Sequence, residues 1–181
     1  MTTVSSKGRW YKGVFLAQTS SVALGQLNSF GSIIHTFAKF ELGMVVTLSI
    51  VSGIDDHKLM VIMRPLQYRA LRDTLYSYME LYDVKQNIKE YVRLFFNGID
   101  KYSGLRNHIA HSVWITGERV DSIMPQSIKI QGGKGKLIND KDDPNRREFT
   151  SVELIDIQNK LSMMHNSYVS WLRSLGYPKD I

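Results

Sequence analysis

The sequence of 181 residues contains no cysteine, which excludes a disulfide framework, a cysteine-based zinc site and a cysteine nucleophile. Long apolar runs are also missing, because the most apolar stretch, residues 42–54, is too short to cross a bilayer. Residues 1–11 are polar and contain no apolar segment of the signal-peptide type. The sequence shows no internal repeat, no low-complexity tract and no glycine-rich phosphate loop. We therefore expect a cytoplasmic protein that does not bind a membrane.

The overall composition is that of a soluble globular protein, with 43% hydrophobic and 22% charged residues. The length fits one domain with enough residues to bury a core. Lysine and arginine together number 23, against 17 acidic residues, and give a net charge of +6. This basic balance favours a polyanionic partner such as RNA, although a slightly basic protein without such a partner explains the charge equally well.

Apolar side chains recur at steps of three and four residues over most of the chain, which predicts helices that pack by one face. The predicted helices cover about residues 22–51, 57–63, 65–82, 86–113 and 150–175. The turn at 52–56 offers an N-cap for the second helix, and Pro65 is expected to begin the third. Thr150 and Glu153 form a capping-box pattern at the start of the last helix, and Gly176 suits the position after its end.

Between the last two helices the apolar period changes from helical to alternating. Residues 127–131 alternate, Gly132 and Gly133 offer a hairpin turn, and residues 134–138 follow as a second strand. A third strand at 114–120 would extend this hairpin. We therefore predict an all-α fold, an antiparallel bundle of four to five helices, with a small β-hairpin insertion at about 113–149. One domain, 13–181, follows a flexible tail, 1–12.

The expected buried rows of two helices each contain one charged residue, Glu41 or Arg106. These rows are Leu27, Phe30, Ile34, Phe37, Glu41, Met44, Leu48 and Val51 in the first helix, and Ile88, Val92, Phe95, Ile99, Tyr102, Arg106, Ile109 and Val113 in the fourth. A buried charge is costly unless it has a partner or faces a pocket. The two side chains either form an ion pair within the bundle or line an anion-binding pocket in which Glu41 orients Arg106. Both can hold at once.

His111 follows Arg106 by five residues, which places it about 140° around an ideal helix. It aligns instead with Asp100, Gly104 and Asn107, a second stripe of small and polar residues. The arginine and the histidine therefore do not share one face of the helix. A symmetric dimer would bring two copies of each residue together and complete the site.

Histidine spacing gives little support for a metal site. His108 and His111 are three residues apart and could be two ligands, but no further ligand occurs at a characteristic spacing. We therefore expect no metal and no cofactor. The other histidines are isolated and are expected at structural or surface positions: His35, His57 and His165.

The insertion is rich in basic residues, and these are candidate RNA-binding residues. They are Lys129, Lys134, Lys136, Arg146 and Arg147. Three aspartates within 140–143 partly cancel this charge, so an ordinary solvated loop is the alternative.

The segment 105–111, Leu-Arg-Asn-His-Ile-Ala-His, resembles the signature of the HEPN domain superfamily, an Arg followed after four residues by a His, with Asn directly after the Arg. Domains of this superfamily are bundles of four or five helices with the motif near the end of a late helix. The predicted architecture resembles theirs from about residue 20 to 175. The resemblance implies a metal-independent endoribonuclease, or a relative that has lost catalysis. It also implies a homodimer with the two motifs at the interface, and a role in toxin–antitoxin, phage-defence or RNA-processing systems, with an antitoxin or regulatory protein as a further partner.

By position, the resemblance assigns catalytic roles to Arg106 and His111 and a supporting polar role to Asn107. Glu41 and His108 are candidate supporting residues. The chemistry follows from residue types: a histidine moves the proton of the 2′-hydroxyl or of the leaving 5′-oxygen, and an arginine stabilises charge on the phosphoryl oxygens. Two alternatives remain open. In one, the chain is not a nuclease but a catalytically silent module that binds RNA, nucleotide or protein. In the other, it is a helical scaffold in which Arg106 has only a structural role.

Overall fold

The computed structural model describes residues 9–11, 14–16, 24–131, 134–138 and 147–177, and for 9–11, 14–16, 127–131 and 134–138 it describes the backbone alone. Five helices form most of it: α1 (Leu24–Ser52), α2 (Asp56–Met63), α3 (Tyr68–Leu81), α4 (Gln86–His111) and α5 (Ser151–Ser174). The strands are β1 (Arg9–Tyr11), β2 (Val14–Leu16), β3 (Val113–Thr116), β4 (Ser122–Gln131), β5 (Lys134–Ile138) and β6 (Phe149–Thr150). The predicted fold class, a helical bundle with a small β insertion before the last helix, is confirmed.

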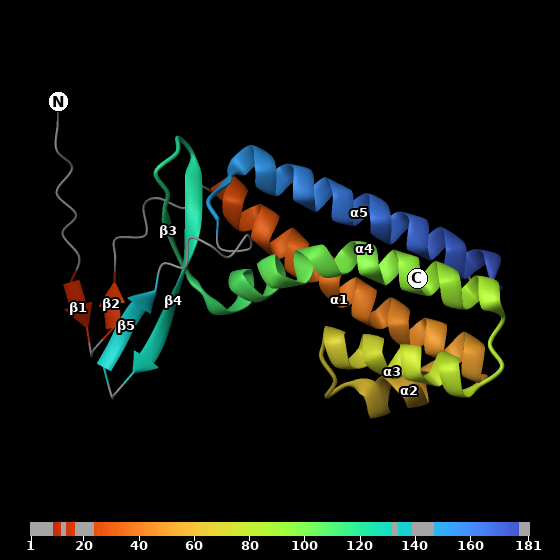
Figure 1. The fold of residues 1–181 in the computed structure, drawn as a ribbon. Coiled ribbons are helices and arrows are strands. Elements are labelled where there is room, and N and C mark those ends of the chain that lie inside the picture. Colours follow the sequence, from red (N-terminus) through yellow and green to blue (C-terminus); the bar gives the residue numbers. More distant parts are fainter. Residues whose placement is uncertain (1–8, 12–13, 17–23, 132–133, 139–146, 178–181) are drawn as a thin grey trace.

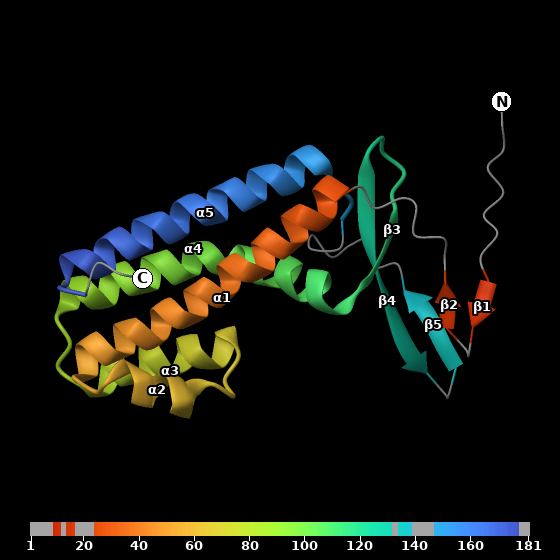
Figure 2. The ribbon, with the colours of Figure 1, turned by 180° about the vertical axis from the view of Figure 1, so that it is seen from behind.

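α1 is the central helix of the bundle and contacts the four other helices. It has α5 on one side and α2 and α3 on the other (Figure 1, Figure 2). Successive helices alternate in direction, so that α1 and α5 run the same way and α4 runs the opposite way (Figure 1). The end of α4 and the start of α5 therefore lie at the same end of the bundle, where the sheet connects them.

The core of α1 is wider than a single row. Phe30, Phe37, Met44 and Leu48 are buried as expected, but Leu27 is 52% exposed, which corrects the predicted row. Ile33 and Phe40 are fully buried, and all six residues from 43 to 48 are buried. Neighbours on several sides remove more of α1 from water than one amphipathic face would.

Residues 42–52 of the apolar stretch form the end of a longer apolar helix, because α1 is continuous over 29 residues. By length and composition α1 is long and apolar enough to cross a membrane. In the structure, however, 56% of its most apolar 18-residue segment is buried inside the protein. A core helix of a soluble protein can have the same length and composition.

The buried face of α4 also differs in detail from the predicted row. Val92 and Ile99 are buried as expected, and Phe96 and Leu105 join them. Val113 was predicted to continue the helix, but it lies in β3 and is 55% exposed. The helix ends at His111 because Ser112, its C-cap, adopts an extended conformation.

The predicted helix ends are mostly confirmed. Asp55 caps α2 by accepting a hydrogen bond from the amide of Lys58 at 3.1 Å. The capping box of Thr150 and Glu153 is present at the start of α5. The prediction that Pro65 begins the third helix is wrong: α3 begins at Tyr68, because its N-cap Gln67 is extended.

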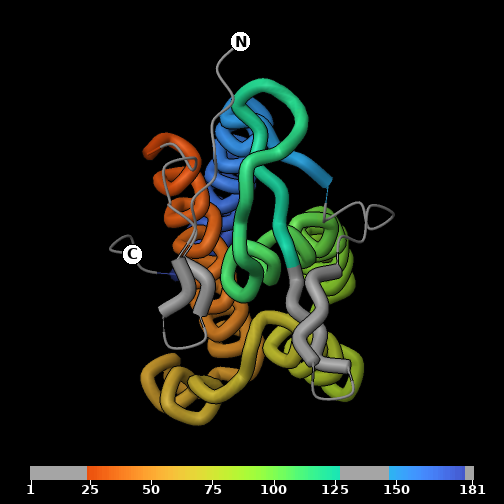
Figure 3. Tube along the Cα trace, turned by 90° about the vertical axis from the view of Figure 1, so that its left-hand side faces the viewer, coloured from red at the N-terminus to blue at the C-terminus, as the bar shows by residue number. Residues whose placement is uncertain are grey.

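The insertion forms an antiparallel sheet around β4 at one end of the bundle (Figure 3). The predicted hairpin is confirmed, since β4 pairs with β5 in the register Ser127 to Ile138. The third strand is also present but stops at Thr116, because residues 117–121 form a turn. β6 was not predicted; it pairs with β4 and leads directly into α5. β1, which lies within the expected tail 1–12, pairs antiparallel with β2, which lies outside it.

Candidate functional site

The Arg106-to-His111 segment occupies the last turns of α4, directly before the sheet. Arg106 is partly buried, with 22% of its side chain exposed. Asn107 and His111 are exposed. The motif therefore joins the bundle core to the surface, and its two ends have different surroundings.

A polar pocket of about 330 Å³ lies beside this segment, between α3 and α4. Its lining comes from three helices and from Gln67, the N-cap of α3. α1 contributes Phe37, α3 contributes Tyr68, Arg69 and Arg72, and α4 contributes Asp100, Ser103, Arg106 and Asn107. Three arginines against one carboxylate make the lining basic. Guanidinium groups bind phosphate and carboxylate oxygens bidentately, so this pocket has the chemistry to hold an anion.

Asp100 ties the two walls of the pocket together. Its carboxylate accepts a hydrogen bond from the Tyr68 hydroxyl at 3.0 Å and forms an ion pair with Arg72. Arg72 also pairs with Asp73 at 2.8 Å. Burial and the adjacent Asp100 charge raise the pKa of the Tyr68 hydroxyl well above its ordinary value, so Tyr68 remains a donor at any physiological pH. These bonds fix Arg72 at the edge of the pocket.

Arg106 is held less completely. Its Nη2 lies 3.7 Å from Glu41 Oε1, and its Nη1 donates to the Asn107 side-chain oxygen at 3.2 Å. The ion pair expected between Glu41 and Arg106 is therefore present, but it is long. Arg106 Nε and Glu41 Oε1 are both buried and have no hydrogen-bond partner. A buried donor without a partner costs roughly 1–3 kcal/mol, so the pairing of these two side chains is incomplete.

The two histidines of the motif lie outside this pocket. His111 is exposed at the last position of α4 and does not line the pocket, in agreement with the angle that separates it from Arg106. His108 lies 3.2 Å from the Ser112 hydroxyl through Nδ1, and its carbonyl accepts from the Trp114 indole at 3.3 Å. These bonds hold the junction between α4 and β3.

Sequence reasoning missed the contribution of α3. None of its pocket residues, Tyr68, Arg69 and Arg72, was singled out as a candidate site residue. Asp100 was placed on the polar stripe with Asn107, and both line the pocket. The polar stripe was the feature of the sequence that could have indicated this contribution. A carboxylate on a helix face beside a buried row implies a cationic partner on a neighbouring helix.

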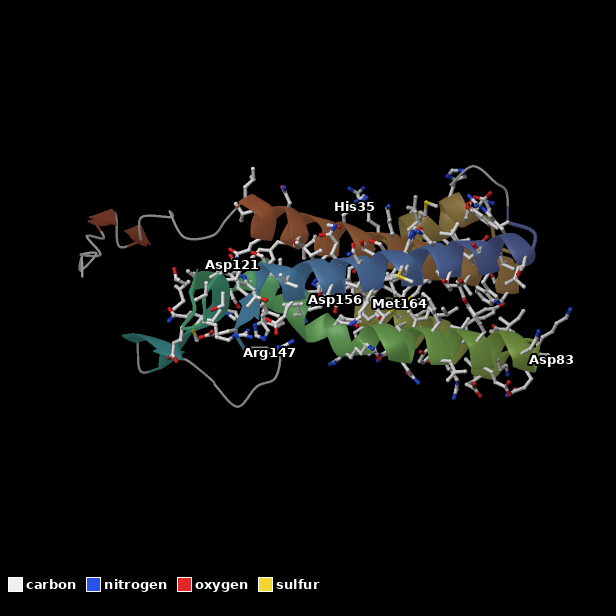
Figure 4. All side chains as sticks on the ribbon, turned by 90° about the horizontal axis from the view of Figure 1, so that it is seen from above. His35, Asp83, Asp121, Arg147, Asp156 and Met164 are labelled. Carbon is white, nitrogen blue, oxygen red and sulfur yellow. The ribbon has the colours of Figure 1, made fainter. Side chains whose placement is uncertain are left out.

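Of the candidate RNA-binding residues, Arg147 is the one with a described side chain. It forms an ion pair with Glu153 at 2.9 Å, and its guanidinium lies 4.7 Å from the centre of the Phe149 ring. It projects at the sheet end of the molecule (Figure 4). Arg146 and the side chains of Lys129, Lys134 and Lys136 lie outside the described residues. The backbone register pairs position 129 with 136.

Among the described residues, no group of three or more histidine, aspartate and glutamate side chains is placed to hold a metal ion. Comparison with protein-family models, with curated proteins and with solved structures finds no match for this chain. The chemistry of the site is therefore inferred from its own residues.

Proposed function

We propose that this protein is a metal-independent endoribonuclease that binds the scissile phosphate beside Arg106 and uses His111 for proton transfer. One observation carries the proposal. Arg106 and Asn107 line a basic pocket that contains two further arginines, and the same helix ends in an exposed histidine one turn later. These are the residue types that phosphodiester cleavage needs when no metal takes part.

The pocket supports the phosphate-binding half of the proposal. Arg106 lines the pocket and 22% of its side chain is exposed, so its guanidinium can donate to a phosphoryl oxygen there. Arg69 lies on the opposite wall and Asn107 extends the donor set at the rim. Charge that develops on the phosphoryl oxygens in the transition state would then face fixed donors rather than mobile water.

His111 supports the proton-transfer half. As a base it accepts the proton of the 2′-hydroxyl, whose oxygen attacks the phosphorus and displaces the 5′-oxygen. A water molecule donates a proton to that leaving oxygen and takes one back from the protonated His111. The products are a 2′,3′-cyclic phosphate and a 5′-hydroxyl, and no water is consumed in this step. Because His111 lies outside the pocket of its own subunit, the proposal includes a homodimer in which the partner's motif completes the site.

The test is cleavage of structured and unstructured RNA by the purified chain in EDTA. We expect His111→Ala to lose cleavage, while His57→Ala, at an exposed histidine of α2, retains it. DNA of the same sequence should resist because it lacks the 2′-hydroxyl. Products should carry a cyclic phosphate detectable by mass spectrometry. If well-folded wild-type protein cleaves no RNA, or if His111→Ala cleaves normally, the proposal fails.

Arg106 needs a stability control because it also pairs with Glu41. Arg106→Lys keeps the charge but not the bidentate fork, so a variant that unfolds like wild type yet cleaves poorly supports phosphate binding. An exposed arginine on the same helix, Arg93, provides the matched Arg93→Lys control. Loss of stability without a selective loss of cleavage would assign Arg106 to the bundle alone.

A second candidate is a silent module that binds RNA or a nucleotide without cutting it. It is favoured by the pairing of Arg72 with Asp100 and of Arg106 with Glu41, and by the position of His111 outside the pocket. In that case RNA binding should persist in His111→Ala and no cleavage should appear in wild type.

A further inference from the structure

A second pocket, of about 320 Å³, lies between α1 and α5. One face of each helix forms it: His35, Lys39, Leu42, Gly43 and Val46 on α1, and His165, Tyr168, Val169 and Leu172 on α5. On each helix these residues recur at steps of one, three or four, so they form a continuous stripe. None of them belongs to the pocket beside Arg106.

The absence of a side chain at Gly43 creates the floor of this second pocket. A Cβ atom there would lie 2.6 Å from Tyr168 Cε1, so the ring rests directly on the backbone of α1. The Tyr168 hydroxyl is buried and hydrogen-bonded to Thr47. The floor is thus a fixed aromatic surface whose polar end is already satisfied.

The pocket has a basic end and an apolar end. α1 and α5 run in the same direction (Figure 1). By their order along the two helices, His35, Lys39 and His165 therefore lie toward one end of the pocket, and Val46 and Leu172 lie toward the other. His35 projects from α1 at the outside of the bundle (Figure 4). The apolar end is walled by aliphatic side chains of both helices.

In the part of the chain that the structure describes, the basic end has no carboxylate partner. Among the described residues, no acidic side chain forms an ion pair with His35, Lys39 or His165. Burial, together with the adjacent Lys39 and His35, lowers the pKa of His165. An anionic group placed there would gain a charge-assisted hydrogen bond from Lys39, and a ring N–H of His165 can donate a second hydrogen bond.

We infer that this pocket binds a medium-chain aliphatic carboxylate, with its carboxylate at Lys39 and His165 and its chain along Val46, Val169 and Leu172. The volume is at the lower end for small-molecule pockets and suits one unbranched chain. Charge complementarity selects a carboxylate over a neutral or cationic amphiphile of the same length. The inference is independent of the proposed nuclease activity.

The experiment is isothermal titration of the full chain with decanoate below its micelle concentration. We expect saturable binding that is weaker for octanoate by roughly tenfold, since two fewer CH₂ groups are buried. Decylamine and decanol should bind much more weakly. Vesicles of phosphatidylglycerol should not bind with comparable affinity, because the pocket takes one free chain rather than a membrane surface.

Two pairs of variants locate the site. Lys39→Met should weaken decanoate binding by about tenfold or more, whereas Lys58→Met, at an exposed lysine of α2, should not change it. Val169→Phe should fill the apolar end and weaken binding, whereas Val152→Phe, at a 74% exposed position of α5, should not. Circular dichroism checks that each variant folds. Absence of binding, equal binding of decylamine, or unchanged binding by both Lys39→Met and Val169→Phe would overturn the inference.

Discussion

Gly43 shows how much one residue decides in this bundle. The Tyr168 ring occupies the space that any side chain at position 43 would need, and its hydroxyl reaches the Thr47 side chain one turn further along α1. The close approach brings α5 against the central helix and also provides the floor of the pocket between them. The packing that glycine permits here offsets the destabilising effect of its low helix propensity.

Replacing Gly43 with alanine should therefore destabilise the protein. The added methyl overlaps a buried ring, and the cost of overpacking exceeds the gain in helix propensity, for a net loss of roughly 1–2 kcal/mol in the free energy of unfolding. Urea denaturation measures it. The matched control is Gly31→Ala on the same helix, where a Cβ meets nothing within 4 Å; it should instead stabilise by up to about 1 kcal/mol. Stabilisation by both substitutions would contradict the described packing.

Among the elements, the sheet is joined to α5 through two carboxylates. Glu148 accepts hydrogen bonds from the backbone amides of Glu118 and Arg119, and these lower its pKa to about 2. Burial would raise the pKa of Glu153, but bonds from Arg119, the Thr150 amide and Arg147 outweigh it and lower the value to about 2. Together they fix the turn after β3 to the first turn of α5.

This junction predicts a loss of stability in acid. Both folded pKa values lie below the ordinary 4.5, so the contribution is complete above about pH 4.5 and is lost as the pH falls toward 2. Glu148→Gln should lower stability at neutral pH and make the decline between pH 4.5 and 2 shallower, as followed by urea denaturation at several pH values. Asp83→Asn, at an exposed carboxylate at the other end of the molecule (Figure 4), should leave the decline unchanged. If stability declines as steeply with falling pH in Glu148→Gln as in the wild type, the hydrogen bonds of Glu148 add no stability.

At the scale of the whole molecule, the arrangement of the site bears on assembly. Arg106 faces a pocket within its own bundle, whereas the exposed His111 lies beyond that pocket, at the end of α4. The proposed nuclease therefore joins the phosphate-binding residues of one subunit to a histidine of another.

Mixing two inactive variants tests this arrangement. Under the proposal, Arg106→Lys and His111→Ala are each defective in cleavage, and mixed dimers hold one site with both residues intact. We expect partial recovery of RNA cleavage after the two purified variants exchange subunits, with dimers confirmed by light scattering. Stable mixed dimers without recovery would place both residues of each site in one chain, and a monomer active at nanomolar concentration would exclude the shared site.

The sequence by itself determined the helices, the hairpin, the capping box at Thr150 and the location of the motif at the end of α4, because periodicity and capping depend on residues that are near one another in the chain. It also indicated that Glu41 and Arg106 need partners, since burial of a charge is costly at any position. The width of the buried face of α1 could not be predicted from the sequence, because this width depends on how many helices surround α1.

Only the tertiary structure decided which side chains form each pocket. The pairing of Arg72 with Asp100 joins residues 28 positions apart, and Tyr168 meets Gly43 across 125 positions. Such contacts depend on the relative rotation and approach of packed helices, which the period of one helix does not specify. The angle between Arg106 and His111 could be predicted because both residues lie on one helix. The position of Arg69 and Arg72 opposite Arg106 could not, because these two residues lie on a different helix.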